Sequence, residues 1–486
     1  MFGITRAPDF DRPGLTWFNV EKPLTLDDLK GRLVVLDFWT FCCINCFHVL
    51  PTLKTLEEAF PAELAVIGVH SPKFDHEQDA ASVAHAIARY GITHPVVHDP
   101  HMHLWEDYAV RAWPTLVFIS PDGYVIGELA GEPHPDLLLQ GIGDMAKQFF
   151  ARGELKPGPL KLTPLTDMGG ALRFPGKIKP CPSVDGTKMW ALADTGHNQI
   201  VVLEDDGTEM VRYGAGDAAL RDGGIEASFN APEGLACDED FIYVADTRNH
   251  AIRRIDRASG QVETLAGLGC RGTILRQPEP GSGVALSSPW DVEVQDGVLY
   301  FANAGSHQIG AVELATGMVR PVAGTGGENI QDGDGDNALL AQPSGLSLGN
   351  GGRTLYFADS ETSAVRRLCL TSGKVDTLVG SGLFEFGHAN GPVADALLQH
   401  PLGVAAVDGR VYVADSYNSS VRFIDLAAET VADLGGVECV DRICRPNAEP
   451  AGIAADGPRR LLVSDTNNHR IMEYLLDEGI SRTWFE

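Results

Sequence analysis

The chain has no long apolar run and few basic residues. Its 486 residues include 38 Lys and Arg against 66 Asp and Glu, a formal net charge of −28. Such a surface repels phosphate backbones, whose binding depends largely on Lys and Arg, so we expect no nucleic acid and no membrane as partner. No stretch approaches the 18 apolar residues of a membrane-spanning helix. The first ten residues lack a continuous apolar region with a cleavage pattern, so we expect a cytoplasmic protein.

Cysteine is also scarce, because nine residues over this length do not form a disulfide framework. Three of the nine cluster at Cys42, Cys43 and Cys46. Most of the others are predicted to be small buried apolar residues: Cys181, Cys237, Cys270, Cys369, Cys439 and Cys444. Cys439 and Cys444 are near enough in sequence to pair, although nothing requires it.

The cysteine cluster lies where an apolar run, Leu33 to Phe38, gives way to a helix-compatible pattern. Amide groups and the dipole at a helix start favour negative charge, so a nucleophilic thiolate is expected at Cys43. Cys46 lies three residues later on the same helical face, where it can resolve a mixed disulfide. Thiol–disulfide exchange is therefore the first hypothesis.

This segment resembles the redoxin branch of the thioredoxin superfamily, in which Asp-Phe-Trp-Thr-x-x-Cys-Ile-Asn-Cys is a familiar form. Asp37 lies six residues before Cys43, at the place of the buried acid that relays the proton of the resolving cysteine. Pro51 lies five residues after Cys46, where the family bends its active-site helix. The resemblance implies a thioredoxin-like fold and catalytic roles for Cys43, Cys46 and Asp37, with no cofactor.

A second segment matches the same family. Trp113-Pro114-Thr115 precedes the apolar run Leu116 to Ile119 and resembles the cis-proline loop that faces the dithiol. The resemblance makes Pro114 part of the catalytic site and implies that Trp113 and Thr115 bind the substrate backbone.

The chain departs from the family at two places. Cys42 replaces the usual Trp, and Ile44-Asn45 replaces Gly-Pro between the cysteines, so the redox potential cannot be transferred. Cys42 is either a third reactive thiol or, as we favour, a small packed residue. His48 is a further possible modulator of the dithiol. Thr40-x-x-Cys43 is also similar to the peroxiredoxin motif but lacks its Pro.

Residues 1–150 alternate strand-like and helix-like runs, which is typical of an α/β domain. We expect strands at 33–38, 64–69, 96–98, 116–119 and 125–129, and helices at 44–59, 78–90 and 135–150. Residues 151–168 are rich in Pro and Gly and are predicted to be a linker.

From residue 169 onward the chain repeats. An apolar strand ends six times in an Asp-like turn and restarts, at Asp194, Asp246, Asn303, Asp359, Asp415 and Asp465. The period of about fifty residues, with several short strands in each copy, predicts a β-propeller. A Pro-x-x-aliphatic element precedes each turn and would start the innermost strand: Pro175, Pro232, Pro289, Pro343, Pro401 and Pro450.

These units resemble NHL repeats, so residues 169–486 are predicted to form a six-bladed NHL propeller. We expect 160–165 to close the ring by pairing with the last blade, whose own outer strand would be 480–485. The domain order resembles the family of NHL-repeat-containing protein 2 and its bacterial relatives.

Three further patterns favour structural roles over metal binding, and no metal site is predicted. Six copies of the Asp turn are explained by side chains that bond nearby backbone amides. Residues 331–336 have Asn337 and Pro343 where a calcium-binding EF-hand loop, counted from Asp332, needs Gly and Glu. His98, His101 and His103 are expected in a polar turn before a short helix at 104–108.

The sequence thus predicts a cytosolic protein-disulfide reductase whose propeller recognises a protein thiol or disulfide partner. The alternative is a non-catalytic adaptor in which the thioredoxin-like fold is only structural. The substrate, the electron donor and the oligomeric state are left open.

Overall fold

The computed structural model describes residues 5–156, 158, 160–165, 169–183, 186–349, 351–435, 438–440 and 443–486, with backbone alone for 438–440 and 443–445. The chain divides into two compact units, Met1–Met168 and Gly169–Glu486. None of the helices within these described ranges is long and apolar enough to span a membrane.

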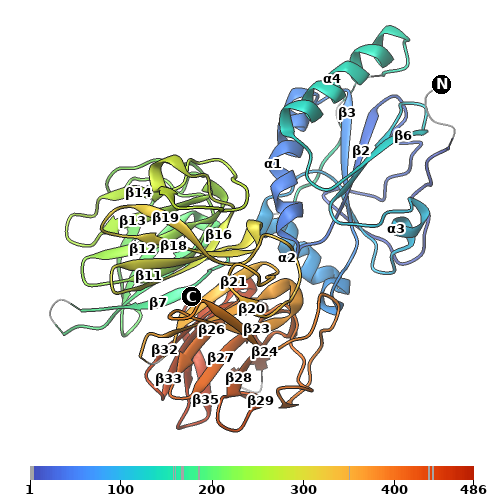
Figure 1. The fold of residues 1–486 in the computed structure, drawn as a ribbon. Helices are drawn as coiled ribbons and strands as arrows, with labels where there is room; N and C mark the ends of the chain where they lie inside the picture. The colour runs from blue at the N-terminus through green and yellow to red at the C-terminus, as the bar shows by residue number, and fades with distance from the viewer. Residues whose placement is uncertain are drawn as a thin grey trace. The chain divides into compact units, whose positions relative to one another are not determined.

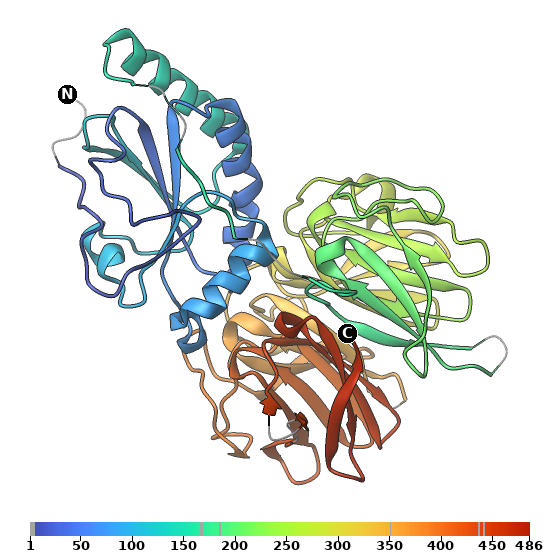
Figure 2. The same ribbon diagram turned by 180° about the vertical axis from the view of Figure 1, so that it is seen from behind.

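The first unit contains a six-stranded sheet in the order β1-β4-β3-β2-β5-β6 (Figures 1 and 2). Strands β2, β3 and β4 are parallel, and β1, β5 and β6 pair antiparallel with their neighbours. The strands are β1 (Thr16–Phe18), β2 (Leu33–Trp39), β3 (Leu64–His70), β4 (Val96–His98), β5 (Thr115–Ile119) and β6 (Val125–Ala130). The helices are α1 (Ile44–Ala59), η1 (Asp75–Gln78), α2 (Ala80–Tyr90), α3 (His103–Asp107) and α4 (Pro135–Ala151).

The expected α/β elements are confirmed, with ends shifted by one or two residues. The helix predicted at 78–90 begins at Ala80 because Asp79 caps it, accepting hydrogen bonds from the Ala81 and Ser82 amides. Strand β1 was not predicted, because its three residues lack the two consecutive valines that mark the equally short β4.

Strand β2 forms the centre of this unit, with all seven residues buried. Leu33 and Val35 belong to the same apolar cluster as residues of α1 and α4, which Figure 1 shows on one side of the sheet. Val34, Leu36 and Phe38 belong to the cluster on the other face. Alternate residues of a strand point to opposite faces, so β2 is apolar on both. Asp37 lies on the α1 face and is the exception.

The described residues of the expected linker contact the first unit. Leu155 joins the α1–α4 cluster, and the Lys156 amide donates to the Gly31 carbonyl at 2.8 Å. Residues 160–165 form no strand, so the expected ring closure through them is wrong. Instead the Thr163 and Leu165 amides donate to the backbone and side-chain oxygens of Asn19.

The second unit is an antiparallel propeller (Figures 1 and 2). It has six blades, as predicted, and the first strand of each blade is the innermost. The innermost strands are β7 (Ile178–Cys181), β11 (Pro232–Cys237), β16 (Pro289–Gln295), β21 (Pro343–Leu348), β26 (Gly403–Val407) and β32 (Pro450–Asp456). The second strands are β8 (Met189–Asp194), β12 (Phe241–Asp246), β17 (Val298–Asn303), β22 (Thr354–Asp359), β27 (Arg410–Asp415) and β33 (Arg460–Asp465).

The outer strands follow in the same order. The third strands are β9 (Gln199–Glu204), β13 (Ala251–Asp256), β18 (Gln308–Glu313), β23 (Ala364–Cys369), β28 (Ser420–Asp425) and β34 (Arg470–Leu475). The fourth are β10 (Glu209–Tyr213), β14 (Val262–Ala266), β19 (Met318–Ala323), β24 (Lys374–Val379), β29 (Thr430–Asp433) and β35 (Ile480–Phe485). Short pieces are β15 (Glu279–Pro280), β20 (Gly333–Asp334), β25 (Gly391–Pro392), β30 (Glu438–Val440) and β31 (Ile443–Arg445).

Blade six supplies all four of its own strands, including the predicted outer strand β35. The ring therefore closes by side-chain packing between the first and last blades. Trp190 and Leu192 of blade one share a buried cluster with Leu462 and Ile471 of blade six. The six predicted proline starts are confirmed at four blades, whereas β7 and β26 begin after their Pro.

The Asp-like turns have the structural role that their repetition predicts. One side-chain oxygen of each turn residue accepts a backbone N–H from 16 to 21 residues upstream. The second oxygen of Asp246, Asp359, Asp415 and Asp465 instead faces a buried arginine. These arginines are Arg253, Arg366, Arg422 and Arg470.

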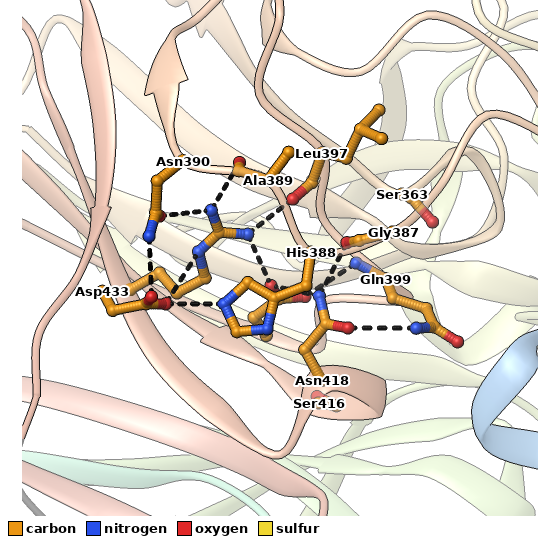
Figure 3. A network of polar contacts seen from close by, with 12 residues as sticks. Ser363, Gly387, His388, Ala389, Asn390, Leu397, Gln399, Ser416, Asn418 and Asp433 are labelled. Carbon is orange, nitrogen blue, oxygen red and sulfur yellow. Dashed lines mark hydrogen bonds and ion pairs between the residues drawn. The ribbon is translucent and has the colours of Figure 1, made fainter.

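Figure 3 shows this network in the fifth blade, around Asn390, Asn418 and Asp433. Arg422 donates to Asn390 Oδ1 at 2.6 Å and pairs with Asp415 at 3.1 Å. In the fourth blade Asp332, from the segment that resembles a calcium loop, accepts from Arg366 at 3.0 Å. That loop therefore supplies a hydrogen-bond acceptor to a buried arginine.

The propeller cysteines differ from the sequence expectation. Cys181 and Cys237 form a disulfide between the innermost strands of the first two blades, and Cys270 is exposed. The prediction that most of these cysteines are simply buried apolar residues is wrong for these three. The side chains of Cys439 and Cys444 lie outside the described residues.

Candidate active site

The dithiol lies at the junction between β2 and α1, as the sequence indicates. Cys43 is the N-cap of α1, and its carbonyl accepts a hydrogen bond from the Cys46 amide at 3.1 Å. Cys43 is partly exposed, whereas Cys46 is 1% exposed. The first cysteine can therefore meet a partner from solvent, and the second lies behind it.

The Cys46 thiol is held in its protonated form. Burial raises its pKa well above the usual value, and a hydrogen bond with Cys43 and the charges of Cys43 and Asp37 raise it further. A thiol must lose its proton before it attacks a disulfide. Cys46 therefore needs a base close by.

Asp37 supplies a carboxylate close to Cys46. It is 1% exposed, and neither of its oxygens has a hydrogen-bond partner among the described residues. Burial raises its pKa to about 7, and the charge of His94 opposes this to a smaller extent. A general base works best when its pKa is near the working pH, so Asp37 is well matched to accept a proton from a thiol.

The Trp113–Pro114 peptide bond is cis and lies at the same edge of the sheet as the dithiol. Thr115 pairs with Phe38 in the β2–β5 ladder, so Pro114 precedes β5 beside the point where β2 ends. Thr115 is buried and donates to the Ala112 carbonyl at 2.8 Å. Trp113 Nε1 donates to the Ser71 carbonyl at 3.0 Å.

The comparisons with known proteins match both units. The AhpC/TSA family model matches residues 5–127, and the NHL repeat model matches residues 398–422. The chain is 38% identical over 508 residues to NHL repeat-containing protein 2 of Homo sapiens, covering 96% of this chain and 69% of that protein. The chain belongs to the NHL repeat-containing protein 2 family.

Two further relatives share parts of this organisation. Over 501 residues the chain is 38% identical to Protein SUPPRESSOR OF QUENCHING 1, chloroplastic, of Arabidopsis thaliana, covering 98% of this chain and 47% of that protein. The chain thus spans about half the length of the plant relative. Over 142 residues it is 29% identical to Thiol-disulfide oxidoreductase ResA of Oceanobacillus iheyensis, covering 29% of this chain and 72% of ResA.

In this member of the NHL repeat-containing protein 2 family, the two possible modulators lie in different surroundings. Cys42 is fully buried, with Sγ 3.7 Å from the Thr40 hydroxyl, which favours the packing role over that of a third reactive thiol. His48 Nδ1 lies 3.0 Å from the carboxylate of Glu132, in the segment after β6.

Glu77 is a site residue that sequence reasoning missed. It is fully buried, and its carboxylate accepts the Thr40 hydroxyl at 2.6 Å and the Cys42 amide at 3.0 Å. The other oxygen accepts the Lys73 and Phe74 amides. Glu77 therefore ties the loop before the dithiol to the loop after β3. No local pattern distinguishes it from its polar neighbours.

Two buried imidazoles lie behind the same loop. His70 and His98 face each other with their Nδ1 atoms 3.0 Å apart, and the Phe41 ring stacks on His70. Burial, and then His98, lower the pKa of His70 well below its usual value, so it stays neutral. His98 Nε2 also faces the Gln78 carbonyl, while His101 and His103 contact each other. No group of three metal-binding side chains occurs in the described part of the chain.

The propeller of this chain has a cavity of about 240 Å³ among its innermost strands. Lys179 Nζ donates there to the Glu293 carboxylate and to the Leu346 carbonyl. The buried Asp291 also lies 4.0 Å from Lys179 Nζ, so this ammonium group faces two carboxylates.

Proposed function

We propose that this chain is a cytoplasmic thiol–disulfide oxidoreductase that reduces protein disulfides, with the propeller as its recognition module. One observation carries the proposal: a partly exposed Cys43 precedes a buried, protonated Cys46. Near Cys46 lies a buried carboxylate, Asp37, that has no hydrogen-bond partner in the described part of the chain. The distant similarity to ResA supports the same chemistry.

In the proposed reaction, the Cys43 thiolate attacks one sulfur of a substrate disulfide and releases the other as a thiolate. Asp37 then takes the proton from Cys46, and the Cys46 thiolate attacks Cys43 Sγ. This releases the second substrate thiolate and leaves a Cys43–Cys46 disulfide, which a dithiol reductant reopens. Trp113, Pro114 and Thr115 would align the substrate backbone beside Cys43.

The test is reduction of a protein disulfide by the full chain with a dithiol reductant. Cys43→Ser is expected to abolish activity, and Cys42→Ser to retain most of it. Unchanged activity in Cys43→Ser would refute the proposal. The reduction potential of the Cys43–Cys46 pair then decides direction, because a value near that of thioredoxin favours a reductase.

The alternative proposal is a non-catalytic adaptor, which Ile44-Asn45 and Cys42 favour because both depart from the redoxin pattern. Capture with Cys46→Ala separates the two proposals, because an active Cys43 would then hold its substrates as mixed disulfides. Only non-covalent complexes would support the adaptor.

A further inference from the structure

Three buried polar groups of the first unit lack a partner among the described residues and lie close to one another. They are the Asp37 carboxylate, Trp39 Nε1 and His94 Nε2. Their residues are 1%, 1% and 4% exposed. A buried polar atom without a hydrogen bond destabilises the fold, so three such atoms at one place indicate a functional role.

Gly68 lies among these groups and carries no side chain. It pairs with Asp37 across the β2–β3 ladder, so both residues face the same side of the sheet. A Cβ at Gly68 would lie 3.0 Å from Trp39 Nε1, 3.2 Å from Val96 Cγ2 and 3.5 Å from His94 Nε2. The absence of a side chain therefore lets the Trp39 and His94 nitrogens approach the strand directly beside Asp37.

His94 leads from Gly68 toward the surface. Its Nδ1 lies 3.3 Å from the Glu57 carboxylate in α1, and the Glu57 side chain is 29% exposed. A carboxylate accepts a hydrogen bond, so it favours the tautomer with the proton on Nδ1. The unprotonated Nε2 then lies beside Gly68 and can accept a proton.

Asp37 faces few other titratable groups. The start of α1 contributes Cys43 and Cys46, and the turn before β4 contributes His94. Its partners in the neighbouring strands, Gly68 and Leu116, carry no charge. Of these groups, His94 alone has a second contact with a partly exposed acid.

We propose that His94 and Glu57 form the proton exit of Asp37. The inference rests on the proposed oxidoreductase function. A proton taken from Cys46 passes from the Asp37 carboxyl to His94 Nε2, either directly or through one bridging water. The imidazole releases its Nδ1 proton to Glu57, which passes it to solvent, and Asp37 returns to the carboxylate. His94 is then neutral with its proton on Nε2, and tautomer exchange, assisted by rotation of the ring, restores the starting arrangement. His94 and Glu57 are positioning residues, because neither touches a reacting sulfur.

The test separates proton exit from the chemical step. Full-length protein lacking the Cys270 and Cys369 thiols reacts with an aromatic disulfide, and release of the second aromatic thiol reports attack by Cys46. One sample is held at about pH 9, where Asp37 is ionised, and another is jumped from about pH 5 to about pH 9 during mixing. Wild type should give the same rate in both samples.

His94→Gln should leave the pre-equilibrated rate within about twofold but slow the jumped sample by roughly tenfold or more, because Asp37 cannot lose its proton quickly. Glu57→Gln should act in the same direction and, being partly exposed, tests the route if His94→Gln fails to fold. The matched controls are His101→Gln and Glu58→Gln, at an exposed histidine and at the neighbouring exposed acid of α1. Equal rates in the two samples for both relay variants would overturn the proposal.

A second readout does not depend on activity. The ¹³C resonance of the Asp37 carboxyl should move as a single line through its titration in wild type, because protons exchange rapidly. In His94→Gln it should split into two lines, for slow exchange. If wild type never releases the second thiol, the oxidoreductase proposal fails, whereas the carboxyl titration still decides whether the proton route exists.

Discussion

The hydroxyl of Thr466 in the last blade donates a hydrogen bond of 2.8 Å to the carbonyl of Pro175, which precedes the first blade. These residues are 291 positions apart, and their contact helps to close the ring. The same hydroxyl-to-carbonyl hydrogen bond joins four other pairs of neighbouring blades: Thr195 to Pro232, Thr247 to Pro289, Ser360 to Pro401 and Ser416 to Pro450. The hydroxyl residue that follows the Asp-like turn residue is thus the donor, and the carbonyl of the repeated Pro is the acceptor, of one hydrogen bond between neighbouring blades.

The third blade departs from this pattern, because Ala304 occupies the donor position. Ala304→Ser would supply a hydroxyl opposite Pro343 and should raise the free energy of unfolding by about 0.5–1.5 kcal/mol, the net value of one hydrogen bond. Guanidinium denaturation of the full chain measures the change. Thr247→Val, which removes an existing bond, should lower stability, and a destabilised Ala304→Ser would contradict the pattern.

The buried arginines should be essential to their blades. Arg366 is fully buried between Asp359 and Asp332. Replacing one partner of a buried ion pair leaves the other charge uncompensated, so Arg366→Met should cost about 3–5 kcal/mol. The next residue, Arg367, is exposed and pairs with Asp376 at 3.7 Å, so Arg367→Met should cost less than about 1 kcal/mol. If denaturant unfolding gave similar losses of stability for Arg366→Met and Arg367→Met, the buried arginine would not be essential to its blade.

Glu77 should determine both stability and activity of the first unit. Glu77→Ala leaves four donors without their acceptor, so we expect a loss of at least about 3 kcal/mol and slower disulfide reduction. Glu58→Ala, on the exposed face of α1, should change stability by no more than about 0.5 kcal/mol. Thermal unfolding and disulfide reduction in the same preparations test both statements. A stable, fully active Glu77→Ala protein would refute them.

Asp37 should make stability depend on pH. Because burial raises its pKa from 3.8 to about 7, the folded protein keeps a proton through this interval that the unfolded chain has released. Stability therefore falls as pH rises from about 4 to about 7, by at most about 4 kcal/mol. The stability of Asp37→Asn should lack this pH dependence, so this variant should be more stable than wild type at about pH 8. The stability of Asp144→Asn, at an exposed position, should depend on pH as that of wild type does. Parallel pH profiles for wild type and Asp37→Asn would contradict the argument.

The disulfide between Cys181 and Cys237 should stabilise the contact between the first two blades. Peptide mapping under non-reducing conditions should recover the two residues as one cross-linked peptide. Replacing both with Ser should lower stability by about 2–4 kcal/mol, as is typical for loss of a disulfide. Cys270→Ser, at an exposed position, is the control. Recovery of both cysteines as thiols would show that the bond does not form.

Much of this organisation follows from the sequence. The period of about fifty residues predicted six blades, and the Asp-like turns and prolines identified where strands begin and end. The place of the dithiol at a strand-to-helix junction was also predictable from the local pattern, whereas Asp37 was expected from the resemblance to the redoxin branch. The predicted ring closure through residues 160–165 was wrong, since these residues contact Asn19 in the first unit.

The sequence by itself determined the blades and the place of the Cys43–Cys46 dithiol. Only the tertiary structure decided that Glu77 holds the loop before the dithiol, that His94 lies between Asp37 and Glu57, and that Cys181 meets Cys237. These contacts join residues from separate elements at irregular distances along the chain, so no period encodes them. They exist because strand pairing and helix packing bring particular side chains together, and that arrangement is a property of the whole fold.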